Sequence, residues 1–163
     1  MRRARGIAST GSRAAGAVAD DLLESVRTRA RANLFWVYLG IEVEAAGEGW
    51  VRLRVPMRDE LRNAAGAPVH GGVLATLVDA AVGGALGTYG SAAAGGVDQA
   101  TLDLNVTFVA AARGEALLAE GRILRKGRSI AFGETRVTDT AGTLVALGRA
   151  TYMIIQPRTG EGS

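Results

Sequence analysis

Residues 71–87 read GGVLATLVDAAVGGALG, and this stretch decides the fold. Its side chains are apolar all round except for Asp79, which predicts a helix buried by other elements. An aspartate is almost never fully buried without a partner. An isolated carboxylate in an apolar setting costs several kcal/mol or takes up a proton. Asp79 is therefore expected either to have a structural partner or to carry the chemistry of the protein.

The face of this helix around Asp79 is lined by small residues. At 100° per residue its nearest neighbours on the helical wheel are Gly72, Leu86, Ala75, Gly83, Thr76 and Val82. Small side chains leave room for a ligand, a strand or a second subunit. The structural alternative is a close helix–sheet contact in which Asp79 accepts a hydrogen bond from a nearby backbone amide.

The remaining elements predict an antiparallel sheet. A polar-faced helix is expected over 17–33, and strands over 35–46, 49–55, 97–110, 116–125, 129–138 and 144–155. Loops are expected over 57–69 and 87–96. One long apolar helix and six strands indicate an α+β fold with the sheet wrapped around that helix. We expect a single domain over 17–158, a flexible basic tail over 1–16 rather than a transit peptide, and a C-terminal tail over 159–163.

Charge and composition exclude several classes of function. The first 19 residues carry four arginines and no acid, whereas the other 144 hold 15 basic and 16 acidic groups. The domain is thus near neutral, which argues against a nucleic-acid partner. One histidine and no cysteine argue against a metal site. No Gly-x-Ser-x-Gly motif or apolar run long enough for a membrane span occurs. We expect a cytoplasmic protein without a cofactor.

Four segments together carry a family resemblance. They are Val69–Asp79 with its His-Gly-Gly start, Asn63–Gly66, Thr101–Phe108 and Lys126–Phe132. The chain resembles the hotdog-fold acyl-CoA thioesterases of the PaaI-like branch from about Phe35 to Ile155. The resemblance implies a hotdog fold, hydrolysis of a coenzyme A thioester, and active sites shared between the subunits of a homodimer or homotetramer.

The resemblance also assigns roles to residues. Asp79 matches the catalytic carboxylate, and Gly71 matches the residue whose backbone N–H polarises the thioester carbonyl. Asn63 and Thr101 match polar residues that hold the thioester and the attacking water. The family usually has one residue fewer between the loop asparagine and the histidine than this chain has between Asn63 and His70. This difference puts the role of Asn63 in doubt. His70 and Gly72 are expected beside the substrate. A histidine at a helix start is more often structural than a general base.

Helix geometry supports a shared site. The start of a helix offers unpaired N–H groups and a partial positive charge, and Gly71 and Gly72 have no side chain to obstruct a carbonyl oxygen. Asp79 lies about 12 Å further along the same axis. That distance is too long for Gly71 and Asp79 of one chain to act on one carbonyl. Pairing Gly71 of one subunit with Asp79 of another resolves it.

A basic turn is the candidate site for coenzyme A phosphates. Arg125, Lys126 and Arg128 flank Gly127, and cations around a glycine suit phosphate oxygens. A solvated hairpin turn is the alternative. Two other functions stay open at this point. One is an acyl-thioester hydratase or dehydratase, which typically needs a histidine paired with an acid. The other is a non-catalytic acyl-CoA-binding module, which would not need Asp79.

Overall fold

The computed structural model describes residues 10–90 and 97–155. Residues 1–9 of the expected basic tail (1–16), the whole expected C-terminal tail (159–163) and residues 91–96 of the expected loop lie outside the described residues, whereas residues 10–16 belong to a helix. Four helical segments and six strands follow one another along the chain: α1 Thr10–Ala32, α2 Leu34–Leu39, β1 Glu42–Gly47, β2 Trp50–Pro56, the 3-10 turn Asp59–Leu61, α3 Gly71–Gly87, β3 Gln99–Phe108, β4 Ala116–Lys126, β5 Ile130–Asp139 and β6 Leu144–Ile154.

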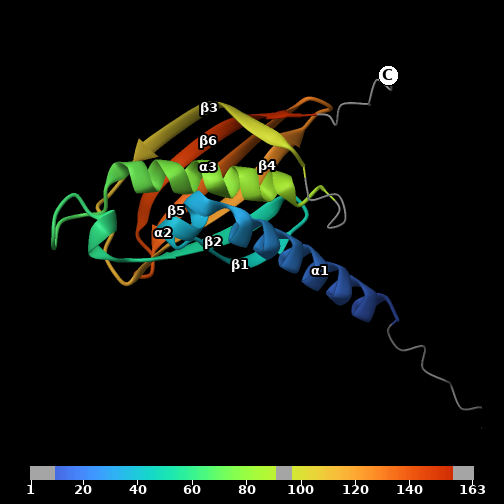
Figure 1. Ribbon diagram of the computed structural model, residues 1–163, viewed down its shortest axis with the longest axis horizontal. Helices are drawn as coiled ribbons and strands as arrows, with labels where there is room; N and C mark the ends of the chain where they lie inside the picture. Colours follow the sequence, from blue (N-terminus) through green and yellow to red (C-terminus); the bar gives the residue numbers. More distant parts are fainter. Residues whose placement is uncertain (1–9, 91–96, 156–163) are drawn as a thin grey trace, which may run out of the picture.

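The six strands form one antiparallel sheet in the order β1-β2-β4-β5-β6-β3. The sheet curves around α3, which lies across its concave face, while α1 runs along the other side of α3 near β1 (Figure 1). The predicted hotdog architecture is confirmed. The 17-residue apolar segment forms α3 over the predicted range.

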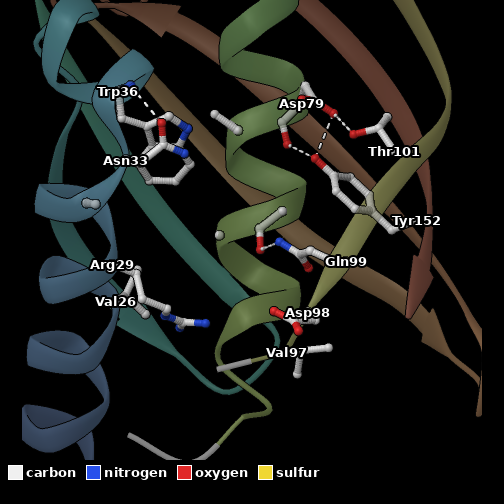
Figure 2. A pocket seen from close by; sticks show the side chains of 14 residues that line it. Val26, Arg29, Asn33, Trp36, Asp79, Val97, Asp98, Gln99, Thr101 and Tyr152 are labelled. Carbon is white, nitrogen blue, oxygen red and sulfur yellow. Dashed lines mark hydrogen bonds between the residues drawn. The ribbon is translucent and has the colours of Figure 1, made fainter. Parts of the chain in front are cut away.

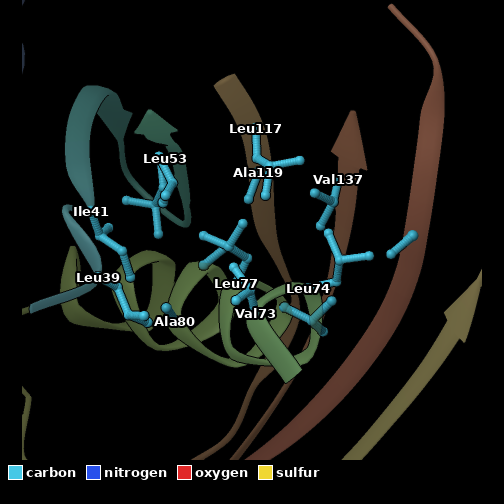
Figure 3. Packing of buried hydrophobic residues seen from close by; sticks show 14 of the residues in the cluster. Leu39, Ile41, Leu53, Val73, Leu74, Leu77, Ala80, Leu117, Ala119 and Val137 are labelled. Carbon is cyan, nitrogen blue, oxygen red and sulfur yellow. The ribbon is translucent and has the colours of Figure 1, made fainter. Parts of the chain in front are cut away.

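The core lies between α3 and the sheet. Leu77, Val78 and Leu86 of α3 are fully buried. Figure 3 shows Leu77 facing Leu53 and Leu117 of the sheet, which are also fully buried. Burying each such side chain contributes roughly 1.5–3 kcal/mol.

Strand glycines let α3 approach closely. A Cβ at Gly121, Gly133 or Gly148 would collide with Ala81, Val82 or Val78 of the helix, respectively. Small residues on both surfaces therefore fix how closely α3 sits on β4, β5 and β6, and this spacing positions the face that carries Asp79.

The predicted strand over 35–46 is wrong in its first half. Residues 34–39 form the short helix α2, and strand β1 begins only at Glu42. The Asn33 side chain accepts hydrogen bonds from the N–H groups of Phe35 and Trp36, both at 3.1 Å, which starts the helix. Gly40 ends it in the left-handed region, with φ 72°. The two caps override the strand preference of this apolar and aromatic run.

Helix α1 begins at Thr10, seven residues before the predicted start, and ends at Ala32. Two arginine side chains attach it to the rest of the domain. Arg27 Nε donates to the Val43 carbonyl of β1 at 3.1 Å, and Arg29 Nη2 donates to the Gly87 carbonyl at the end of α3 at 2.7 Å. The bond from Arg29 brings α1 to the end of α3, and residues of α1 line the cleft described below.

Strand β3 is an edge of the sheet and pairs only with β6. Leu104 and Phe108 lie opposite Ala150 and Ala146, two buried residues of β6, yet they remain 39% and 56% exposed. Apolar side chains on the inner face of an unpaired edge are a surface that a further element can cover.

Candidate active site

The Asp79 carboxylate accepts two hydrogen bonds on the same oxygen. Thr101 Oγ1 of β3 donates to Oδ1 at 2.8 Å, and the Tyr152 hydroxyl of β6 lies 2.6 Å from Oδ1 (Figure 2). The Tyr152 hydroxyl is also 2.8 Å from the Asp79 carbonyl oxygen. No described residue bonds to Oδ2. The second carboxylate oxygen is thus the one left for chemistry.

The sequence pointed to Asp79 and Thr101 but not to Tyr152. Tyr152 is only 5% exposed and lies opposite Thr101 in the β3–β6 ladder. Burial and the hydrogen bond to Asp79 raise the pKa of its phenol above the ordinary value. The neutral, donating form is therefore favoured. An inward-facing tyrosine in the alternating pattern of the last strand was the available signal, because a buried hydroxyl requires a partner.

Asp79 is partly buried and opens onto a cleft, in contrast to the full burial that the apolar segment suggested. The cleft has a volume of about 390 Å³ and lies between α1, α3 and the start of β3 (Figure 2). Its floor is the small-residue face of α3, Ala80, Gly83 and Gly84. Trp36 of α2 packs over Gly84, where an added Cβ would lie 3.4 Å from the indole ring. Of the six neighbours predicted around Asp79, only Gly83 lines this cleft, and Tyr152 and Gln99 of the strands also contact it.

The other predicted catalytic groups lie at the far end of α3. His70 caps the helix, and its Nδ1 accepts a hydrogen bond from the Gly72 N–H at 2.9 Å. That bond gives His70 a structural role as the cap of the helix. The N–H of Gly71, the first residue of the helix, has no acceptor among the described residues. The Phe108 ring lies against Gly71, 3.4 Å from where a Cβ would be.

Asn63 is exposed at the base of the loop before α3, and its side chain donates to the Pro68 carbonyl at 3.3 Å. The loop closes because the Asn63 N–H also bonds to Pro68 and the His70 N–H bonds to Leu61. Asn63 thus belongs to the Gly71 end of the helix. The structure brings Thr101 to Asp79 and leaves Asn63, His70, Gly71 and Gly72 in a separate group, as the spacing along α3 requires.

The basic turn lies near the opposite end of α3. Arg125, Lys126 and Arg128 are exposed around Gly127, where β4 turns into β5. Lys126 Nζ is 5.4 Å from the centre of the Tyr89 ring, which follows the last turn of α3. This contact places the cations on the side of the molecule where the cleft ends, away from Gly71.

Within residues 10–90 and 97–155, no three acidic or histidine side chains gather as a metal site would require. In the same part of the chain, no helix has the length and hydropathy to span a membrane. The polar groups nearest the Asp79 carboxylate are the Thr101 and Tyr152 hydroxyls. Such a set can hold and deprotonate water, or attack a carbonyl, beside a bound acyl group.

Comparison with known proteins identifies the family. A model of the thioesterase superfamily matches residues 68–146. The human protein named acyl-coenzyme A thioesterase 13 is 33% identical over 133 residues, which cover 80% of this chain and 91% of the human protein. The chain belongs to the thioesterase superfamily. The resemblance to the PaaI-like hotdog enzymes is confirmed, and this thioesterase is a thioester hydrolase.

Solved structures of this superfamily superpose on nearly their whole length. One thioesterase-superfamily protein matches with a TM-score of 0.74 and 35% identity, over 82% of this chain and 98% of its own. Zebrafish thioesterase superfamily member 2 matches with a TM-score of 0.68 and 30% identity, over 84% of this chain and 98% of its own. Escherichia coli PaaI shares the fold of this thioesterase, with a TM-score of 0.75 and 17% identity over 85% of this chain and 96% of its own.

Proposed function

We propose that this thioesterase hydrolyses a coenzyme A thioester with Asp79 as its catalytic carboxylate. The observation that carries the proposal is the Asp79 carboxylate itself, which is held by two hydroxyls on Oδ1, has no described partner on Oδ2, and belongs to a side chain that lines a cleft beside small residues. A carboxylate fixed in this way suits general-base or nucleophilic chemistry.

The reaction follows from the free oxygen. Acting as a base, Oδ2 takes a proton from water, whose oxygen attacks the thioester carbon. Acting as a nucleophile, Oδ2 attacks that carbon itself, and water then cleaves the acyl-aspartate. In both routes the carbonyl oxygen becomes an oxyanion, the C–S bond breaks, and coenzyme A leaves as its thiolate, which is then protonated.

The oxyanion donor in this proposal is the Gly71 N–H of a second subunit. Within one chain it lies eight residues from Asp79, or about 12 Å along the helix. The unpaired β3 edge exposes Leu104 and Phe108, of which Phe108 lies against Gly71, and this apolar edge supports an interface there. A homodimer built on this edge would contain two equivalent sites, each with Asp79 from one subunit and Gly71 and Asn63 from the other.

The basic turn is the proposed phosphate site. Arg125, Lys126 and Arg128 are exposed cations on a domain of near-zero net charge, and Gly127 allows close approach to its backbone. The acyl-CoA thioesterase name of the human relative supports coenzyme A as the carrier. The lack of cysteine in the sequence supports a cytoplasmic location.

The first test is release of free thiol from a panel of acyl-CoA esters, followed with a thiol-reactive dye. We expect thiol release by the wild type and almost none by Asp79→Asn. A change in double-bond absorbance without thiol release would identify a hydratase. Binding without either signal would identify an acyl-CoA-binding module.

The shared site has its own test. Gly71→Pro removes the N–H at the first helical position, where proline is tolerated, and the extended backbone of His70, φ −66° and ψ 133°, suits a following proline. Gly71→Pro and Asp79→Asn should each be inactive. Subunit exchange between them should restore activity to about a quarter of the wild-type level, since half the dimers become mixed and each has one intact site. No recovery in proven mixed dimers would contradict the shared site.

Arg128→Ala tests the phosphate site. We expect a higher KM for acyl-CoA and a nearly unchanged kcat, because the lost contact acts equally on ground and transition states. The effect should disappear with a short acyl thioester that lacks the nucleotide, and should shrink at high salt. Equal kinetics of the variant and the wild type on acyl-CoA at low salt would remove Arg128 from the phosphate site.

A further inference from the structure

Phe108, the last residue of β3, points inward and is nevertheless exposed. It lies opposite Ala146 of β6, a fully buried residue, and this pairing places its side chain on the inner face of the sheet. The ring is 56% exposed, because β3 is an edge strand that pairs only with β6. Ring atoms Cε1 and Cζ lie 3.4 Å from the position that a Cβ on Gly71 would take. A large aromatic ring in this position is suited to burial by a partner.

Neither packing nor backbone geometry within one chain requires a glycine at position 71. Gly71 is not among the glycines with a positive φ, and an added Cβ would make only ordinary van der Waals contact with Phe108. Gly72 differs, because a Cβ there would lie 2.9 Å from His70 Nδ1, the atom that caps the helix. The cap thus explains Gly72. At Gly71 an open space and an N–H without a described acceptor occur together, as expected where a group from outside the chain binds.

The two ends of β3 contact the two halves of the proposed active site. Thr101, near the start of the strand, donates to Asp79 at 2.8 Å, and Phe108 at its end lies against Gly71. Seven residues of extended strand span about 23 Å. Within one chain Phe108 is therefore remote from Asp79.

A two-fold axis near the middle of β3 changes which residues meet. Two copies related by such an axis pair their β3 edges antiparallel, so the end of each strand lies beside the start of the other. Phe108 of one subunit then approaches Thr101 and Asp79 of the other, and Gly71 accompanies it. The strand thus leads to the same shared site as the spacing along α3, by an independent route.

We propose that Phe108 positions the thioester carbonyl in the active site of the other subunit, by covering one side of the Gly71 N–H that receives the oxyanion. This role rests on the proposed function, since it requires hydrolysis at Asp79. An apolar ring beside the N–H excludes water from that side, and a hydrogen bond to an oxyanion is stronger where water is excluded. Phe108 acts through Gly71 rather than on the reacting atoms, so it is a positioning residue.

The test measures kcat at protein concentrations where light scattering shows only dimers. The substrate is the ester of the acyl-CoA panel that the wild type hydrolyses fastest. We expect Phe108→Ala to lower kcat by about tenfold, less than the about 10²–10³-fold cost of removing an oxyanion donor outright. KM should change little, because the cover acts in the transition state. Phe108→Leu keeps an apolar side chain at this position and should retain kcat within a few-fold.

Leu104→Ala is the matched control. Leu104 lies on the same strand and the same face as Phe108, is 39% exposed and belongs to the same proposed interface. It is four residues from Phe108, about 13 Å along the strand. We expect Leu104→Ala to weaken the dimer and, once dimeric, to keep the wild-type kcat. If Phe108 only packs in the interface, Phe108→Ala will behave in the same way, and a wild-type kcat in its dimer would overturn the proposal.

Mixed dimers identify the subunit in which Phe108 acts. Dimers of Phe108→Ala with Asp79→Asn, purified through two different affinity tags, should reach about half the wild-type kcat, since one of their two sites is intact. Dimers of Phe108→Ala with Gly71→Pro should not exceed the Phe108→Ala protein, because neither of their sites is intact. No recovery in the pair with Asp79→Asn would place Phe108 in the site of its own chain and overturn the proposal. If Phe108→Ala does not dimerise by itself, this pair still provides the test.

Failure of the positioning role and failure of the proposed function give different results. A wild type that releases no thiol from any ester contradicts the hydrolysis and, with it, the role of Phe108. A wild type that hydrolyses thioesters, together with a Phe108→Ala dimer of unchanged kcat, contradicts only the role of Phe108.

Discussion

Asp79 and Asp139 are two aspartates held in opposite ways. Asp139, the last residue of β5, is 1% exposed, and its carboxylate accepts three backbone N–H groups. The Arg113 N–H bonds to Oδ2 at 2.7 Å, and those of Ala141 and Thr143 bond to Oδ1 at 3.0 and 2.9 Å. Asp79 accepts only side-chain hydroxyls, all on one oxygen, and lies against a cleft.

Under the proposed function, this difference distinguishes Asp139, an acid that stabilises the fold, from Asp79, the proposed catalytic acid. Both oxygens of Asp139 are occupied by backbone donors, which fixes the turn and leaves nothing to react. Burial acts to raise the pKa of the Asp139 carboxyl. The backbone hydrogen bonds from Arg113, Thr143 and Ala141 outweigh burial and hold this pKa below its ordinary value. Burial of a carboxylate alone is therefore no sign of a catalytic role. A free oxygen facing a cavity is the more informative feature.

Asp79→Asn should show the largest effect, a fall in thioester hydrolysis of at least about a hundredfold, because the positioned carboxylate is lost. The fold should remain, since no described N–H faces Oδ2. Steady-state thiol release and a urea unfolding curve measure the two quantities. Retention of more than about a tenth of the activity would contradict the assignment of Asp79.

Asp139→Asn should lower the stability of the fold and leave the activity nearly unchanged. Its new amide would place an NH2 group against a backbone N–H, or leave one N–H without its acceptor. We expect the free energy of unfolding to fall by about 2 kcal/mol. Activity per folded molecule should stay within about twofold of the wild type, as expected for a structural site. Urea unfolding at a fixed protein concentration provides the measurement. A stable Asp139→Asn protein with lost activity would break the comparison.

Acid should reduce the stability difference between wild type and Asp139→Asn. The folded pKa of Asp139 is depressed, so its contribution is complete above the unfolded pKa of about 3.9 and is lost as the pH falls through the folded value. The two unfolding free energies should therefore differ most near neutral pH and converge below about pH 4. A constant difference from pH 7 to pH 3 would show that the carboxylate charge is not the stabilising element.

Tyr152→Phe should lower kcat/KM by about tenfold, because Oδ1 loses one of the two donors that hold the carboxylate in place. The fall should appear in kcat with little change in KM, whereas a packing defect in the cleft would also raise KM. The raised pKa of Tyr152 places its ionisation above the assay range, so no basic limb from tyrosine is expected. An unchanged kcat would limit Tyr152 to a packing role.

Thr101→Val should show the smallest effect, a few-fold loss of kcat/KM, because a neutral hydrogen bond is worth about 0.5–1.5 kcal/mol. Thr107→Val is the matched control, since Thr107 lies on the same strand, is exposed and pairs with Leu147 on the outer face. Initial rates with one acyl-CoA ester are sufficient. An equal loss in both variants would mean that β3, rather than the Thr101 hydroxyl, was disturbed.

The sequence predicted the parts of the fold that depend on local pattern. The apolar run of α3, the alternation in the later strands and the glycine-containing turns indicated one helix and six strands. The same run singled out Asp79 because it holds the only charge. The prediction failed at α2, since the LFWVYL run has the composition of a strand and only the Asn33 and Gly40 caps make it helical. Short apolar runs do not distinguish the two by periodicity.

The sequence by itself determined that one acid lies on a small-residue face of a buried helix, and that its distance from Gly71 exceeds the reach of a single site. Only the tertiary structure decided which groups meet that acid. Tyr152 reaches Asp79 across 73 positions of sequence, and Arg29 reaches Gly87 across 58. Such contacts depend on how the strands pair and on how closely α3 packs on them. Pairing and packing are set by the whole core together, and no local pattern around Tyr152 or Arg29 encodes them.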